Sequence, residues 1–240
     1  GRHRYMNPPP FRRNHRFFTN RVVFKIHEIE HLMDRAVQEC SGQLVYLLRH
    51  PIANSISRTV QPRLELFLYS PFYAALVGEP ERTLEIRSIA ESGMPLQRAV
   101  ISWCYENLTT LRNPDPARLV VTYEELVINP VKSCDLLMQK LDLTDRESML
   151  AAFERPAINI RMSHAQTLAA MSSPDAEKRR MRLVSKWRDT ISEQQYKQIQ
   201  HLLQLFKLDA YDARYPLAAT SHLHFPDTPA LLGAMVSSGD

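Results

Sequence analysis

An arginine, a proline and a serine between residues 49 and 57 have the types and spacing of an anion-binding site. The apolar run at residues 44–48 has the length of a strand buried on both faces, and Pro51 favours the first position of a helix. The free N–H groups and the positive dipole end of that helix would face a phosphate or sulfate. Arg49 adds a permanent charge, and Ser57, two turns into the helix, adds a hydroxyl. The alternative is an Arg49 solvated at the strand end and a Ser57 bonded to its own helix.

Polar side chains also end two further predicted strands. Residues 21–27 read RVVFKIH, which places Lys25 and His27 two positions apart and so on one side of an extended segment. The sequence RLVVTYEELVINP places Tyr123 and Glu124 directly after a third strand, residues 118–122. In an open parallel sheet a ligand binds outside the carboxyl ends of the strands, so these side chains and Arg49 are expected to share one site.

Four segments of the chain resemble, in order, the sulfotransferases that use 3′-phosphoadenosine 5′-phosphosulfate (PAPS). The typical segments of that family read K-T-H, R-x-P-x-x-x-x-x-S and Y-E-D-L, followed by a segment centred on a tryptophan. This chain has KIH at 25–27, RHPIANSIS at 49–57, YEEL at 123–126 and RRMRLVSKW at 179–187. Four matches in the same order are far more specific than any one of them.

The resemblance implies a role for each matching residue toward PAPS as co-substrate. Arg49 and Ser57 would hold the 3′-phosphate, Arg180 would join them from a C-terminal loop, and Tyr123 would lie near the nucleotide. The family's R-K-G sequence is only partly kept, because Met181 and Arg182 follow Arg180.

The resemblance also implies a catalytic pair. His27 would be the general base that takes the proton from an acceptor hydroxyl, and Lys25 would help to neutralise the sulfuryl oxygens. The cationic Lys25 would disfavour protonation of His27 and keep it able to act as a base. Such a transfer needs positioning, charge neutralisation and one proton acceptor rather than a metal. Glu28 is the alternative base, and an ordinary histidine at a strand end is the other interpretation of His27.

One family feature has no counterpart in the sequence. In the family, the first strand leads into a P-x-S-G-T-T type of loop that cradles the 5′-phosphosulfate, and the six glycines of this chain form no such loop. The chain therefore resembles a family member without its N-terminal unit, and we expect this polypeptide alone to transfer sulfuryl groups poorly. The acceptor class stays open between carbohydrates and small molecules.

Two other functions remain as alternatives. One is a non-catalytic protein of the sulfotransferase fold that binds a 3′-phosphorylated adenine nucleotide or a protein partner. The other is a nucleic-acid binder using a basic N-terminal arm, but no recognised motif or stacking pattern supports it, so no nucleic acid is expected.

The elements that must position these residues alternate between strands and helices. This alternation predicts an α/β fold, an open parallel sheet with helices on both faces, and the resemblance implies the fold of sulfotransferases and P-loop nucleotide kinases. Residues 1–20 form an Arg- and Pro-rich arm, 21–214 the α/β domain and 215–240 an irregular tail. Apolar periodicity and capping residues predict helices at 29–40, 96–111, 130–141, 144–153 and 192–206. The last two would begin with capping boxes, Thr144 with Glu147 and Ser192 with Gln195.

The stretch 61–87 is aromatic and interrupted by prolines, and it shows no regular strand or long helix. At least two of its aromatic residues are expected to cover the core, and the alternatives are an acceptor pocket or a contact with a partner; these residues are Phe67, Tyr69, Phe72 and Tyr73. The stretch 156–186 shows no clear period and is predicted as a functional loop or lid.

Composition limits the remaining possibilities. A chain of 240 residues, 44% hydrophobic and 23% charged, can build one substantial core, and no apolar run approaches the length of a membrane-spanning helix. Three cysteines in apolar helical patterns predict free buried thiols, and no zinc-binding spacing occurs. Six Arg residues in 1–21 and six Lys or Arg residues in 178–188 stand against an acidic body, which favours anionic ligands at defined places. The oligomeric state and the compartment stay open, with the cytoplasm favoured.

Overall fold

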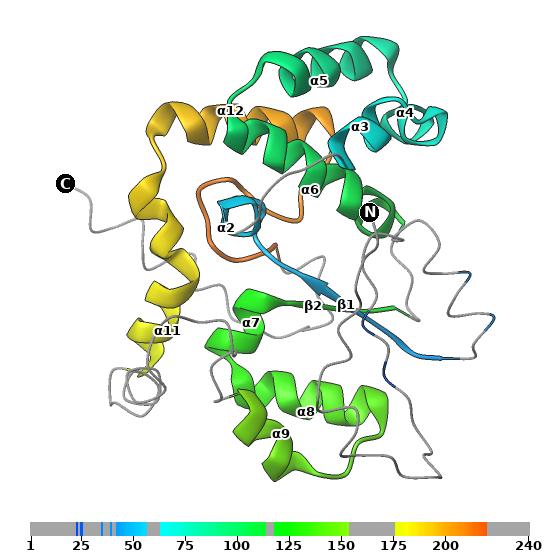
Figure 1. Cartoon of the computed structure of the whole chain (residues 1–240). Coiled ribbons are helices and arrows are strands. Elements are labelled where there is room, and N and C mark those ends of the chain that lie inside the picture. The colour runs from blue at the N-terminus through cyan, green and yellow to red at the C-terminus, as the bar shows by residue number, and fades with distance from the viewer. Residues whose placement is uncertain are drawn as a thin grey trace, which may run out of the picture.

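The computed structural model describes residues 42–56, 63–113, 118–153 and 176–219, together with residues 23, 25, 35 and 39. This part of the chain is mostly helical and has a small parallel sheet of two strands, β1 (Leu44–Leu48) and β2 (Arg118–Thr122), near its centre (Figure 1). The helices, in chain order, are α2 (Pro51–Ile56), α3 (Arg63–Leu68), α4 (Pro71–Val77), α5 (Pro80–Ser92), α6 (Pro95–Arg112), α7 (Tyr123–Ile128), α8 (Pro130–Leu141), α9 (Arg146–Phe153), α11 (Ala176–Ser185), the 3-10 helix η3 (Lys186–Thr190) and α12 (Glu193–Leu205).

The two strands are parallel, and their last residues, Leu48 and Thr122, lie opposite each other. Leu44 lies opposite Arg118 and Leu48 opposite Thr122, so the residues that follow the strands, Arg49 and Tyr123, leave the sheet side by side. Helices cover both faces of the sheet: α6 with α3, α4, α5 and α12 lie on one face, and α8 with α9 lie on the other (Figure 1). The prediction of an α/β arrangement is confirmed at this level.

Alternation of side chains along the strands separates two apolar clusters. Tyr46 and Leu48 of β1 belong to a large core shared with α6 and α12, whereas Leu119 and Val121 of β2 pack with Leu137 of α8. The prediction that β1 is buried on both faces is only half right, because Leu47 is 58% exposed. On the α8 side the buried cluster is built on β2, so β1 is covered completely only on its α6 side.

The prediction that residues 61–87 contain no long helix is wrong, because the 13-residue helix α5 begins at Pro80. This stretch holds α3, α4 and most of α5. The prolines that suggested interruptions begin helices instead, because Pro71, Pro80 and Pro95 each occupy the first turn of α4, α5 or α6. Proline fits there since its fixed φ is already helical and its missing N–H would have had no partner within the helix.

Four aromatic residues in this stretch divide equally between the core and the surface. Phe67 and Tyr73 are buried, whereas Tyr69 and Phe72 are exposed. Phe67 stacks on Tyr105 of α6, and Tyr73 meets the same ring edge-on. The interpretation that at least two of these rings cover the core is confirmed.

Other sequence predictions are confirmed in type and corrected in detail. The predicted helices at 96–111, 130–141, 144–153 and 192–206 correspond to α6, α8, α9 and α12, and the Ser192–Gln195 capping box is present. At α9, however, the Asp145 carboxylate accepts the Ser148 N–H at 3.0 Å, so Asp145 caps this helix in place of the predicted Thr144. Residues 123–128 and 176–185, for which no helix was predicted, form α7 and α11.

Several predictions fall outside the described residues. These are the arm at 1–20, the strand at 21–27 except residues 23 and 25, the helix at 29–40 except residues 35 and 39, the segment 154–175 and the tail from 220. Arg35 and Glu39 are helical and form an ion pair at 2.7 Å, in agreement with a helix there. The start of the predicted tail is irregular but packed: Pro216 is buried and the Ala219 N–H bonds to the Ala210 carbonyl at 2.8 Å.

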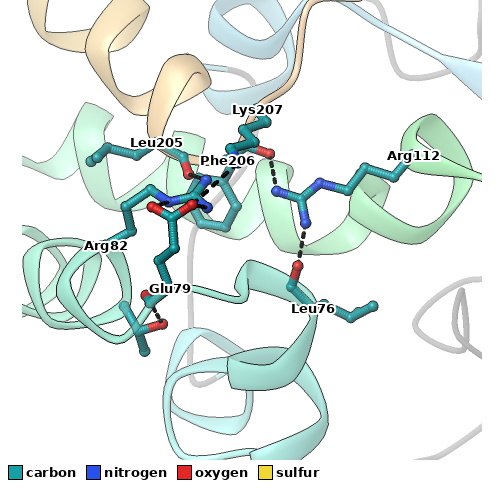
Figure 2. A network of polar contacts seen from close by, with 8 residues as sticks. Leu76, Glu79, Arg82, Arg112, Leu205, Phe206 and Lys207 are labelled. Carbon is teal, nitrogen blue, oxygen red and sulfur yellow. Dashed lines mark hydrogen bonds and ion pairs between the residues drawn. The ribbon is translucent and has the colours of Figure 1, made fainter.

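Two arginines hold the carboxyl end of α12 against α4, α5 and α6 (Figure 2). Arg112, the last residue of α6, donates to the Phe206 carbonyl at 2.7 Å and also to the Leu76 carbonyl. Arg82 of α5 donates to the Leu205 carbonyl at 3.1 Å and pairs with Glu79. The last carbonyls of a helix have no partner within it, so these charged donors satisfy groups that would otherwise lack one.

We expect Arg112→Ala to lower the free energy of unfolding by about 1.5–3 kcal/mol, because it removes charged donors from two part-buried carbonyls. Urea denaturation followed by circular dichroism measures this. The exposed Arg98 lies on the same helix, and Arg98→Ala should change the free energy by less than about 0.5 kcal/mol. Equal effects of the two substitutions would contradict the proposed role of Arg112.

Candidate anion-binding site

The backbone between β1 and α2 is fixed by side chains from two distant helices. The indole N–H of Trp103, from α6, donates to the Arg49 carbonyl at 3.0 Å. The carboxylate of Glu124, from α7, accepts the His50 N–H at 2.9 Å. The Arg49 carbonyl and the His50 N–H belong to the same peptide group, so this one peptide is held at both of its polar atoms before the helix begins at Pro51.

His50 is the buried centre of this junction. Its ring stacks on Trp187 of η3 with centroids 4.2 Å apart and meets Tyr211 edge-on. Its Nδ1 accepts the Ile52 N–H at 3.3 Å, and its Nε2 lies 3.2 Å from the Asp212 carbonyl, so Nε2 carries the proton. Burial lowers the pKa of His50 to about 3, and the nearby positive charge of Arg49 acts in the same direction. The imidazole is therefore neutral at physiological pH.

This geometry corrects one part of the sequence interpretation. The first N–H groups of α2 were expected to be free for an anion, but the Ile52 N–H is bound by His50 Nδ1. His50 thus caps its own helix. Any anion at this junction has to rely on the arginine side chains more than on the helix end.

Glu124 is a buried carboxylate, 1% exposed, with donors on both oxygens. One oxygen accepts the His50 N–H and the other accepts the Tyr211 hydroxyl at 2.8 Å. Burial raises the pKa of Glu124, while these hydrogen bonds and the charge of Arg49 act against that rise. Burial, followed by the neighbouring carboxylate, raises the pKa of Tyr211 far above its usual value. The hydroxyl of Tyr211 therefore stays protonated and serves as a donor.

The guanidinium group of Arg49 lies over the ring of Tyr123, with 4.6 Å between its central carbon and the ring centroid. Its Nε is buried and has no hydrogen-bond partner in the described part of the chain. The parallel register explains the contact, because both residues directly follow paired strand ends. A guanidinium held against an aromatic face keeps its orientation and its charge while its N–H groups stay available to an anion.

Arg180 is carried by α11, which packs against α7, the helix that begins with Tyr123 (Figure 1). The inward face of α11 is marked by Arg180, Met181 and the buried Val184, whereas most of its other residues are exposed. The Nε of Arg180, like that of Arg49, is buried and has no partner among the described residues. A helix rather than the predicted loop therefore carries Arg180.

The other predicted site residues are less completely placed. Lys25 is described and exposed, but the neighbours of Lys25 along the chain lie outside the described residues, as do His27 and Ser57. The structure thus brings Arg49 and Tyr123 into contact, puts Arg180 on a helix adjoining Tyr123, and leaves the predicted base untested.

Sequence reasoning missed how the junction is held. It placed Glu124 at a strand end without its role as an acceptor, and it gave no role to His50, Trp103, Trp187 or Tyr211. One signal could have indicated Glu124: a carboxylate directly after a buried strand is unusual unless it has partners. The described residues contain no group of three or more His, Cys, Asp or Glu residues arranged to hold a metal ion. No described helix is both long and apolar enough to cross a membrane.

Comparison with known proteins adds no further assignment: no protein-family model, no curated protein and no solved structure matches this chain.

We expect acid to destabilise the protein through His50. The unfolded chain takes up a proton near pH 6.5, whereas the folded chain resists it down to about pH 3. The stabilisation is complete above pH 6.5 and falls, as the pH drops, by up to about 1.4 kcal/mol per pH unit. Glu124 has a raised pKa and acts in the opposite direction, so the effect of His50 has to be isolated by substitution.

The His50→Asn variant provides that comparison, because asparagine can still cap α2 but does not titrate. Chemical denaturation at several pH values between 4 and 7 should show a shallower loss of stability in the variant. Parallel curves for the two proteins would show that His50 does not stay neutral in the folded state.

Proposed function

We propose that this protein binds a 3′-phosphorylated adenine nucleotide at the β1–α2 junction and is a PAPS-dependent sulfotransferase. It would move a sulfuryl group from PAPS to an acceptor hydroxyl of a carbohydrate or a small molecule. The proposed fold is that of the sulfotransferases, an open parallel sheet related to the P-loop nucleotide kinases, of which β1 and β2 would be two neighbouring strands.

One observation carries the nucleotide part of the proposal: the Arg49 side chain is stacked on Tyr123 and has a buried, unpartnered Nε in the described part of the chain. A buried donor without a partner costs free energy. Arg87 and Arg118 also have a buried Nε without a partner, but their guanidinium groups donate to main-chain carbonyls through other nitrogens. The guanidinium group of Arg49 makes no such hydrogen bond to the described residues, so we expect a ligand to accept its N–H groups. The residue sits at the carboxyl ends of parallel strands, which is where open α/β sheets bind ligands.

A second arginine supports an anion with more than one charged contact. The Nε of Arg180 is also buried without a partner among the described residues, on a helix packed against the Tyr123 helix. Two guanidinium groups suit the doubly charged oxygens of a phosphate monoester, because each can donate in a forked arrangement. Ser57, one residue beyond the end of α2, would add a hydroxyl to the same phosphate.

The transfer part of the proposal rests on Lys25 and His27 in the sequence. A positioned imidazole would remove the proton of the acceptor hydroxyl while a lysine neutralises charge on the sulfuryl oxygens. The alternative remains a protein that binds the nucleotide without transferring anything. It is favoured by one observation: Arg49, Tyr123 and Arg180, the proposed nucleotide residues whose surroundings are described, serve binding and not proton transfer.

We expect Arg49→Ala to weaken the binding of adenosine 3′,5′-bisphosphate by roughly ten- to a hundredfold, the value of one charge-assisted hydrogen bond. Titration calorimetry measures the affinity. Arg98→Ala removes an exposed arginine of α6 and should leave the affinity unchanged.

Adenosine 5′-monophosphate separates the 3′-phosphate contact from general damage to the site. The wild-type protein should prefer the bisphosphate, and Arg49→Ala should reduce that preference, because the two changes remove the same interaction. A preference that is the same in both proteins would assign the 3′-phosphate to another part of the chain.

We expect His27→Ala to lower turnover by about 10² to 10⁴ while nucleotide affinity stays nearly unchanged, since a general base acts on the rate and not on cofactor binding. The assay follows transfer from PAPS in a protein in which a 5′-phosphosulfate loop is present or has been added. A loss of only a few-fold would direct attention to Glu28. Nucleotide binding without detectable transfer in the wild-type protein would favour the non-catalytic alternative.

A further inference from the structure

A row of basic side chains lies on the outer face of α11 and continues into η3. Lys178, Arg182 and Lys186 are exposed and follow one another at intervals of four residues. Lys178 and Arg182 therefore lie along one side of α11, and Lys186 is the first residue of η3, directly after α11 ends. Lys178 and Arg182 are about 6 Å apart along the axis of α11, since an α-helix rises about 1.5 Å per residue. We call these three residues the basic row.

The basic row is not paired with carboxylates in the described part of the chain. In the part of the chain that the structure describes, these three side chains form no ion pair and no hydrogen bond, whereas other surface arginines do. Arg146 pairs with Asp135 and Arg214 with Glu193. Three like charges at helical neighbour positions repel one another, and this cost is removed when a polyanion binds.

The same helix presents opposite faces to the proposed nucleotide site and to the solvent. Arg180 and the buried Val184 lie on the inward side, toward α7, and the basic row lies on the other side. A ligand on the basic row therefore does not touch the nucleotide-binding arginines. It can reach the reacting centre only if it is a chain long enough to pass around α11.

We propose that the basic row binds an anionic polysaccharide, and that this polymer is the acceptor class of the sulfotransferase. The proposal rests on the proposed function, because that function requires a hydroxyl-bearing acceptor. A polymer with charges repeated along its length matches a row of cations better than a small acceptor does.

Nucleic acid fits this surface less well. Single-stranded nucleic acids bind to grooves in which aromatic side chains stack on the bases. The one aromatic residue of α11 and η3, Trp187, is buried and stacks on His50. The basic row therefore offers charge without stacking.

The test compares two triple variants that remove the same charge. Lys178→Ala/Arg182→Ala/Lys186→Ala removes the basic row, and Arg98→Ala/Lys140→Ala/Lys197→Ala removes three exposed basic residues elsewhere. A size-defined heparin dodecasaccharide serves as the probe in fluorescence anisotropy at low and moderate salt. We expect the first variant to lose affinity by at least about tenfold and the second by less than about threefold, the gap narrowing as salt rises.

Measuring nucleotide affinity in the same variants distinguishes a failure of the basic-row inference from a failure of the proposed function. The basic-row variant should bind adenosine 3′,5′-bisphosphate as the wild type does, and Arg180→Ala should lose nucleotide affinity while keeping heparin affinity. Heparin binding through the row in a protein that fails to bind the nucleotide would support the surface and overturn the sulfotransferase.

Three results would overturn the inference itself. These are unchanged heparin affinity in the basic-row variant, equal losses in both triple variants, and tighter binding of a single-stranded oligonucleotide or of phosphatidylserine vesicles through the same row. A positive result would be strengthened by turnover: removal of the row should raise KM for a polymeric acceptor and leave kcat within about twofold.

Discussion

The buried carboxylate of Glu124 is the constraint on which the rest of the site depends. It joins the backbone of the β1–α2 junction to the hydroxyl of Tyr211, so that three segments far apart in the chain meet at two oxygens. Burial raises the pKa of Glu124, and the hydrogen bonds to its oxygens and the nearby charge of Arg49 favour the charged form against that rise. The ring of His50 beside Glu124 is neutral, so the junction does not carry the cost of burying a charged imidazole as well. Arg49 can be held at the strand end because its backbone neighbours cannot move.

Apolar spacing predicted the long helices because one face of each is packed against the core. In α6, Val100, Cys104 and Leu108 recur at helical intervals and are fully buried, and α12 shows the same pattern. The shorter helices were missed for different reasons. Prolines at their first turns suggested loops for α4 and α5, and α11 turns an arginine and a valine inward rather than a row of apolar residues.

The contact between Arg49 and Tyr123 follows from the pairing of β1 with β2, because each residue comes directly after its strand. The sequence could suggest this contact, since it shows polar residues at the ends of predicted parallel strands. The network around His50 could not be predicted in this way. Its bonds connect residues 74, 87 and 162 positions apart, and nothing local to His50 indicates a partner near residue 212. Local sequence determines which groups need partners, but the partners themselves are chosen by tertiary packing.

The segment after α12 curls around α2 and brings Tyr211 and Asp212 to His50 (Figure 1). The junction is therefore completed by some of the last described residues of the chain. During synthesis, β1, α2 and β2 leave the ribosome well before Tyr211 does, so His50 and Glu124 spend that interval without their final partners. Proteolytic removal of the chain from residue 211 onward would take these partners away again, and the backbone that carries Arg49 would lose part of its support. The position of Arg49 in the anion site thus depends on the segment after α12, although none of the proposed ligand-binding residues lies in that segment.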